Sequence, residues 1–150
     1  MNNSYYKIQI SNWHFFCLFT FYFLLSACSV PNLEQPECTE SRIAVKEFYS
    51  FHFGHEMKFT AENLKLREKY LTPSLLASIL PKNDETDIFT TNSTDFPKAF
   101  RLGVCKVIEP TKTDFEVVFF WKDDNRNEQK TIHIEAVKQT DKWLLNRILY

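Results

Sequence analysis

The stretch that decides the fold is residues 115–121, which read FEVVFFW. Every second residue of this stretch has a large apolar side chain: Phe115, Val117, Phe119 and Trp121. Glu116, Val118 and Phe120 stand between them. Successive side chains of a strand point to opposite faces of the sheet, so this period of two predicts a β-strand. Its first face is too aromatic to be left in water, and we expect helices to cover it.

The same alternation continues on both sides of this strand. Residues 101–109 supply an earlier strand, and 123–127 a turn. Ile132, Ile134 and Ala136 then alternate with His133 and Glu135. Thr140 and Asp141 form a tight turn into a last strand over 142–150. These segments predict an antiparallel sheet of four strands in meander order.

Helices are expected before the sheet. Apolar residues at spacings of three and four predict an amphipathic helix from about Ser41, weakened at its end by Gly54. Thr60 can cap a second helix, and Thr72-Pro73 is a start signal for a short third helix over 74–80. Residues 81–100 predict an irregular loop. Helices followed by antiparallel strands indicate the α+β class.

The N-terminal segment reads as a targeting signal. Residues 13–27, WHFFCLFTFYFLLSA, form an apolar run shorter than the roughly 20 residues that cross a bilayer. The end of this run and the cysteine after it, Leu25-Ser26-Ala27-Cys28, resemble the bacterial lipobox. An uncleaved anchor helix, or ordinary cleavage with Cys28 as a bystander, are the alternatives; ordinary cleavage would put Leu25 where a small residue is usual.

The lipobox resemblance implies that Cys28 is acylated and becomes the first residue of a mature protein attached to the bilayer. Ser29 after it implies sorting to the outer membrane, with the domain facing the periplasm. We therefore expect a signal peptide over 1–27, a lipidated tether over 28–40 and a folded domain over 41–150. Two prolines and no periodicity mark residues 29–40 as a tether.

The remaining cysteines then form one pair. Cys17 leaves with the signal and Cys28 is acylated, so Cys38 and Cys105 are expected to form a disulfide in an oxidising compartment. Closing a loop of about 67 residues is worth roughly 4 kcal/mol in the chain-entropy model. Two buried free thiols are the alternative.

Composition excludes some classes of function. The formal net charge is −1 and no basic stripe is present, so nucleic acid is not an expected partner. The only glycines are Gly54 and Gly103, so there is no glycine-rich phosphate loop, and we expect no cofactor.

The candidate catalytic and metal residues are few. His52 and His55 lie in HFGHE, which lacks the spacing of a zinc-protease motif, and we expect no metal site. His133 with Asp87 or Asp95 could serve as an acid–base pair in a pocket, but we expect no catalytic residues and no enzyme. The candidate functional surface is an aromatic face, formed by Phe119, Trp121, His133 and Trp143, that would bind a partner if the helices leave it open. A core covered by helices is the alternative.

Four segments resemble a known family in their order: AVKEFYSFH (44–52), YLTPSLLASIL (70–80), DIFTTNSTDF (87–96) and DKWLLNRI (141–148). They are similar to a bacterial family of unknown function in the cystatin-like superfamily, typified by nuclear transport factor 2, and to its small enterobacterial envelope lipoproteins. The resemblance implies a cone of helices on a curved four-stranded antiparallel sheet.

The expected function is that of a non-enzymatic binding or accessory module, anchored by lipid, for a periplasmic or outer-membrane protein. Two alternatives stay open at this point. One is a periplasmic immunity or inhibitor lipoprotein, and the other is an enzyme of the cone-shaped superfamily that binds a small molecule.

Overall fold

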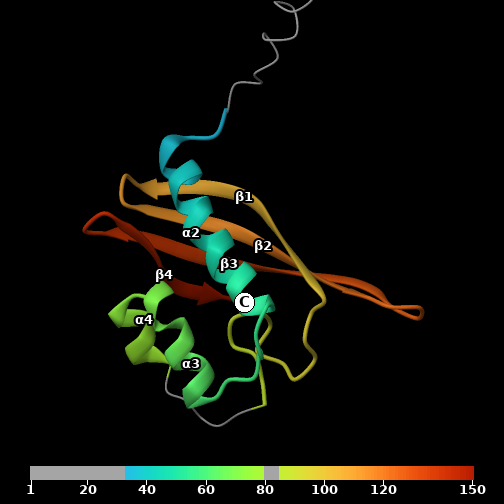
Figure 1. The fold of residues 1–150 in the computed structure, drawn as a ribbon. Coiled ribbons are helices and arrows are strands. Elements are labelled where there is room, and N and C mark those ends of the chain that lie inside the picture. Colours follow the sequence, from blue (N-terminus) through green and yellow to red (C-terminus); the bar gives the residue numbers. More distant parts are fainter. Residues whose placement is uncertain (1–32, 80–84) are drawn as a thin grey trace, which may run out of the picture. The chain divides into compact units, whose positions relative to one another are not determined.

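The computed structural model describes residues 33–79 and 85–150 (Figure 1). The expected signal peptide and Cys28 lie outside these residues. Glu34–Tyr150 forms one compact unit. Its helices are α2 (Pro36–Phe53), α3 (Ala61–Arg67) and α4 (Pro73–Ser78), with a 3₁₀ turn, η1 (Glu68–Tyr70), after α3. No helix in this part of the chain is both long and apolar enough to span a membrane.

Four antiparallel strands follow the helices: β1 (Ala99–Glu109), β2 (Lys112–Lys122), β3 (Asn127–Gln139) and β4 (Lys142–Leu149). Their order in the sheet is β1-β2-β3-β4. The expected α+β class and the meander are therefore confirmed. In Figure 1, α2 runs across one face of the sheet, and α3 and α4 lie beside the β4 edge.

The core forms where the alternation predicted it. Phe115, Val117, Phe119 and Trp121 of β2 are buried, with Ile132, Ile134 and Ala136 of β3 beside them. Val45, Phe48 and Tyr49 of α2 pack onto this face. Burial of this much aromatic and branched apolar surface is the main stabilising contribution of the fold.

Helix α2 begins at Pro36 and not near Ser41, so the prediction that 28–40 is a tether is wrong for its last five positions, 36–40. Proline suits the first helical turn, where its missing N–H has no partner to lose. Glu37 in the same turn complements the positive end of the helix dipole. The helix ends at Phe53 with Gly54 as its C-cap.

The predicted caps of the short helices are present. The Thr60 side chain accepts a hydrogen bond from the Asn63 N–H, and the Thr72 side chain accepts one from the Leu75 N–H. The Thr72 N–H also donates to the Leu145 carbonyl at 2.9 Å, which ties the start of α4 to the edge strand β4.

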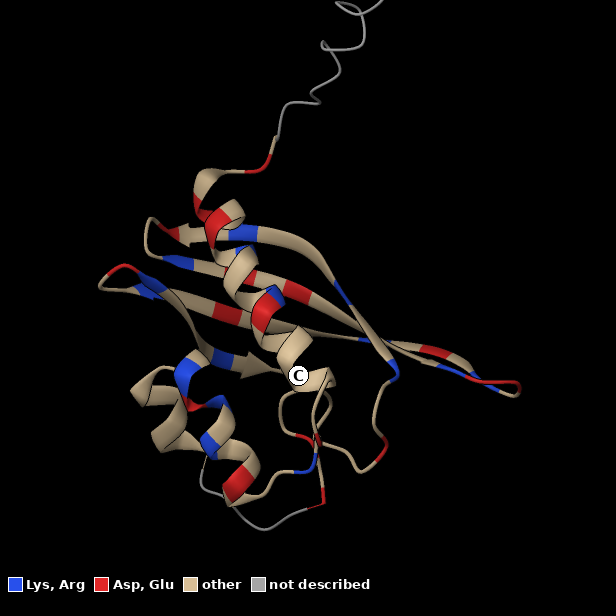
Figure 2. Ribbon diagram, in the orientation of Figure 1, with Lys and Arg blue, Asp and Glu red and all other residues tan. Residues whose placement is uncertain are grey.

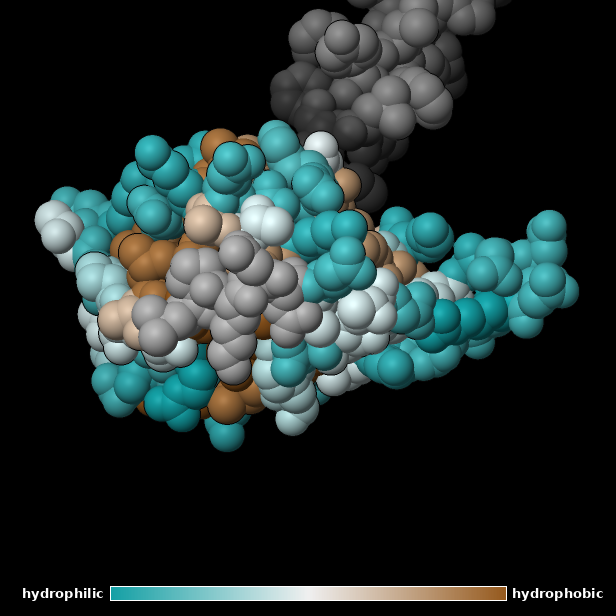
Figure 3. Space-filling view, turned by 90° about the horizontal axis from the view of Figure 1, so that it is seen from below, coloured by the Kyte–Doolittle hydropathy of each residue, from teal (hydrophilic) through white to brown (hydrophobic). Residues whose placement is uncertain are grey.

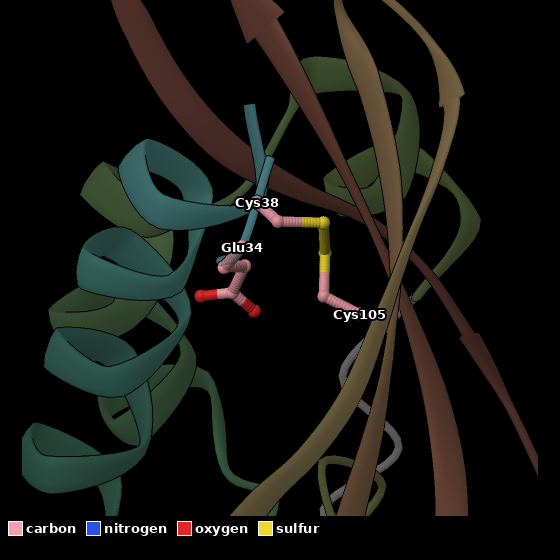
Figure 4. Close-up of side chains that lie close together, drawn as sticks. All are labelled: Glu34, Cys38 and Cys105. Carbon is pink, nitrogen blue, oxygen red and sulfur yellow. A yellow bond between two sulfur atoms is a disulfide. The ribbon is translucent and has the colours of Figure 1, made fainter. Parts of the chain in front are cut away.

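The predicted disulfide between Cys38 and Cys105 is present and joins the first turn of α2 to β1 (Figure 4). The two Cα atoms are 5.9 Å apart. Beside it, the Arg42 guanidinium pairs with Glu34 and donates to the Gly103 carbonyl at 3.2 Å. The N-terminal end of α2 is therefore fixed to the sheet covalently and by hydrogen bonds.

The surface carries both signs of charge. Figure 2 shows acidic and basic positions interspersed along α2 and the strands. Seen from below, apolar side chains gather over the part that carries α3 and α4 (Figure 3). Leu66 of α3 is one of the exposed apolar residues.

Candidate functional site: a groove beside helix α2

A hollow of about 640 Å³ lies between α2, η1 and the turn that joins β3 to β4. Four α2 side chains form one wall: Glu40, Ile43, Ala44 and Glu47. The β3–β4 turn supplies the other: Lys138, Asp141, Lys142, Trp143 and Leu144. Lys69 and Tyr70 of η1 also line it. We call this hollow the α2–hairpin groove.

Local sequence builds both walls. Positions 40, 43, 44 and 47 are spaced by three and four, so they share one face of α2. Thr140 has a φ of 56°, in the left-handed region, and lets the chain reverse tightly between β3 and β4. The reversal brings Lys138, Asp141 and Lys142 to one end of the sheet.

Glu40 links the two walls. Its Oε2 accepts a hydrogen bond from Lys138 Nζ at 2.8 Å and one from the indole Nε1–H of Trp143 at 3.1 Å. The bond from Lys138, and then that from Trp143, lowers the pKa of the Glu40 carboxyl. The hydrogen bond between Lys138 and Glu40 also raises the pKa of the Lys138 ammonium group. Both side chains are solvent-accessible, so the pair sets geometry more than stability.

Other charges of the groove are not paired in this way. Within residues 33–79 and 85–150, the Glu47 and Lys142 side chains make no hydrogen bond or ion pair. Lys69 Nζ lies 4.8 Å from the centre of the Tyr70 ring and 5.0 Å from that of Phe51. Ile43 is 60% exposed.

The aromatic binding face predicted from sequence does not exist as one surface, and this prediction is wrong. Phe119 is fully buried and Trp121 is 3% exposed, because α2 and the segment before β1 cover their face of the sheet. His133 points to the opposite face, since its neighbours Ile132 and Ile134 point inward, and its Nδ1 lies 2.8 Å from Asp114 Oδ2. Of the four residues, only Trp143, 8% exposed, lines the groove.

The acid–base pairs considered from sequence are not assembled either. Asp87 meets His52 and not His133: His52 Nε2 lies 2.9 Å from Asp87 Oδ2, and both side chains are fully buried. Asp95 pairs with Arg126 at 2.6 Å. His55 follows the C-cap of α2 and is exposed, and its Nδ1 is 2.7 Å from the Phe51 carbonyl oxygen, whereas His52 is buried, so the two histidines do not converge.

A buried polar network surrounds His52. Arg67 Nε donates to His52 Nδ1 at 2.8 Å, so Nδ1 is unprotonated and the ring proton on Nε2 is donated to Asp87. Asp87 also accepts from the Thr90 hydroxyl at 2.8 Å and from the Phe89 N–H at 2.9 Å. Sequence reasoning missed Arg67; the signal was an arginine three residues after Leu64, on the buried side of α3.

Burial shapes the pKa values around this network. It lowers the pKa of Arg67, while the nearby Asp87 charge acts in the opposite direction. It raises the pKa of Tyr49 well above the usual range, and the Asp87 charge adds to this. Tyr49 donates its hydroxyl proton to the Phe89 carbonyl at 2.8 Å. The network holds α2, α3 and the loop after residue 85 together, and its members do not line the α2–hairpin groove.

A second hollow of about 350 Å³ lies between α4 and β4. Tyr150 closes it on one side and donates its hydroxyl proton to the Ile88 carbonyl at 2.5 Å. Burial, and then the Asp87 charge, raises the pKa of Tyr150 to about 12. The hollow adjoins Ile79, next to the undescribed residues 80–84, and we assign it no role.

One group of three metal-ligating residue types lies close together in the described chain: Glu34, Cys38 and Cys105 (Figure 4). The two sulfur atoms are bonded to each other, so neither is available as a thiolate ligand. Glu34 is held by Arg42, whose Nε lies 2.9 Å from Glu34 Oε2. This arrangement braces α2 against β1 and does not fit a metal ion.

Comparison with known proteins finds a similarity of fold. No protein-family model matches the chain, and no curated protein does. The chain is similar to a crystal structure of a protein of unknown function from Bacteroides thetaiotaomicron VPI-5482, with 16% identity and a TM-score of 0.52. The match covers 75% of this chain and 90% of the other. At this identity the likeness concerns the fold alone.

Proposed function

We propose that this chain is a non-enzymatic binding module, anchored by lipid in the bacterial envelope, that binds a protein partner. The observation that carries the proposal is the α2–hairpin groove. It combines a concave surface, the exposed apolar side chain of Ile43 and charges of both signs that its own residues leave unpaired.

The placement of the acid–base residues also favours binding over catalysis. A catalytic base must reach its substrate within hydrogen-bond distance or through one water. His52 and Asp87 are fully buried and use their hydrogen-bonding atoms on each other, on Arg67 and on Thr90. The groove itself holds lysines, carboxylates and aromatic rings, which are suited to recognition.

Anchoring is proposed from the sequence around Cys28. The LSAC motif after a short apolar run favours acylation of this cysteine and attachment to the outer membrane, with the domain in the periplasm. Two or three acyl chains hold a protein far more firmly than one. Confinement to one membrane surface raises the effective concentration of the groove for partners in the same envelope.

We further propose that the domain is a cone of the cystatin-like, nuclear transport factor 2 type. Support comes from the order of elements, with a long N-terminal helix packed across a four-stranded antiparallel meander.

The experiment is a crosslinking pull-down from bacterial membranes with the full chain. We expect a protein of the envelope to be recovered with the wild-type chain and to be much reduced with Cys28→Ala, which lacks the proposed anchor. Recovery of no envelope protein above the background of an unrelated lipoprotein would contradict the proposal.

A further inference from the structure

The two walls of the α2–hairpin groove differ in the sign of their net charge. The helix wall carries Glu40 and Glu47, and the hairpin wall carries Lys138 and Lys142 together with Asp141. Figure 2 shows positions of both signs on α2 and at the β3–β4 turn, so the difference between the walls concerns only the residues that line the groove. Because Lys69 balances Asp141, the lining as a whole has no net formal charge.

The groove uses only part of this charge internally. Glu40 and Lys138 pair with each other at 2.8 Å. Glu47 on the helix wall and Lys142 on the hairpin wall are left without an ion pair inside the described chain. Asp141 on the hairpin wall and Lys69 of η1 have no ion pair there either. An occupant therefore meets the Glu47 carboxylate on the helix wall, and on the hairpin wall the Lys142 ammonium group with the Asp141 carboxylate next to it in sequence.

Apolar surface lines the same groove. Ala44, Tyr70, Leu144 and Trp143 line the groove, and Ile43 projects from α2 with 60% of its surface exposed. An exposed isoleucine beside aromatic rings favours burial of an apolar side chain from a partner.

We infer that the groove binds a segment of a partner protein in which an apolar side chain lies between a basic residue and an acidic residue. The basic residue faces Glu47 and the acidic residue faces Lys142. The inference rests on the proposed function and names the chemistry of the partner at this site. A neutral lining does not attract a polyanion such as nucleic acid, and opposite charges on the two walls select the direction of a segment.

The test is site-specific photocrosslinking with the full chain in bacterial envelopes. A benzoylphenylalanine residue replaces Ile43 in one variant and Ile108 in the control. Ile108 is matched because it is also an exposed isoleucine, 47% exposed, but lies on β1 away from the groove. Mass spectrometry then identifies the segment crosslinked to each position.

We expect the Ile43 position to crosslink at least fivefold more than the Ile108 position, to a segment with a basic and an acidic residue around an apolar one. Glu47→Lys and Lys142→Glu should each lower the yield severalfold. Asp124→Lys in the exposed β2–β3 turn and Lys122→Glu at the exposed end of β2 reverse charges outside the groove and should leave the yield unchanged.

Several results would overturn the inference: equal crosslinking at the two positions, a segment of one charge sign, crosslinking to a second copy of this chain, or no response to the two groove reversals. Capture of one protein partner at Ile108 alone would reject this groove and leave the proposed function standing. Capture at neither position, with an empty pull-down, would reject both.

Discussion

At the residue scale, Asp87 is a fully buried carboxylate at the centre of a buried polar network. It accepts hydrogen bonds from His52, Thr90 and the Phe89 backbone and balances the charge of Arg67 through the His52 ring. Removing one member of a buried charge network leaves the other charge uncompensated, which typically costs about 3–5 kcal/mol.

We therefore predict that Asp87→Ala lowers the free energy of unfolding by about 3–5 kcal/mol, measured by urea denaturation. Asp124→Ala is the control, because Asp124 is exposed in the β2–β3 turn and its side chain makes no hydrogen bond in the described structure. It should change stability by less than about 0.5 kcal/mol. Equal effects of the two variants would show that the network contributes nothing.

Tyr49 and Tyr150 predict a loss of stability in alkali. The pKa of Tyr49 is raised well above its usual value and that of Tyr150 to about 12, so both phenols stay protonated in the folded chain when an unfolded chain has lost these protons. Unfolding then releases protons, and stability falls as pH rises through about 10 toward 12.

For the fully buried Tyr49, the loss approaches about 1.4 kcal/mol for each pH unit above the ordinary tyrosine pKa. Tyr49→Phe should show a shallower decline between pH 9.5 and 11.5, although it is less stable at pH 7 by about 1–3 kcal/mol because the Phe89 carbonyl loses its donor. Urea denaturation at several pH values measures this. An unchanged slope would contradict the raised pKa.

The polar network could not be derived from the sequence. His52 and Asp87 are 35 positions apart, and they meet only because the loop after residue 85 folds back onto α2. Periodicity describes which face of an element is apolar, and it carries no information on which polar residue of another segment arrives there. The sequence could have shown that Arg67 is a charged residue on the buried side of α3, but not that His52 is its hydrogen-bond partner.

At the scale of elements, the disulfide fixes α2 to β1. It closes a loop with a sequence separation of 67, for which the chain-entropy model gives roughly 4 kcal/mol. We predict that the Cys38→Ala/Cys105→Ala double variant unfolds with about that loss, measured by urea denaturation.

Reducing agent provides the control for this prediction. It should destabilise the wild-type chain by a similar amount and leave the double variant unchanged. A wild-type chain that is indifferent to the reductant would show that the bond does not stabilise the fold.

The elements themselves were largely predictable. The alternation in 115–121 and 132–136 predicted two adjoining strands and their buried faces, and the threonine caps predicted where two helices begin. The start of α2 was missed because its first turn, with Pro36 and Glu37, has no apolar periodicity. The groove was also missed, because Glu40 and Glu47 lie on the exposed side of α2. The apolar periodicity of a helix identifies its buried side and carries no information about its exposed residues.

At the scale of the whole molecule, the proposed anchor makes its own prediction. Cys28→Ala removes the thiol that receives the acyl chains, so the variant should take up no labelled palmitate, while Cys17→Ala should be labelled like the wild type. Palmitate labelling in growing bacteria, followed by separation of membranes, measures this. Labelling of the Cys28→Ala protein would contradict the lipoprotein proposal.

The proposed lipid anchor would assist binding at the α2–hairpin groove. A tethered domain explores only a thin layer beside the membrane, so a groove of modest affinity can stay occupied by a partner in that layer. Ile43 can be changed with little effect on the fold, since its side chain is mostly in solvent. A substitution at Ile43 therefore tests partner binding without a change in the stability of the fold.

The most direct measurement of the central claim is the amount of envelope partner recovered by membrane crosslinking with Ile43→Asp, compared with Ile108→Asp and the wild type. The account predicts a loss of at least fivefold for Ile43→Asp, wild-type recovery for Ile108→Asp, and similar melting temperatures for all three chains. Undiminished recovery with Ile43→Asp would contradict it.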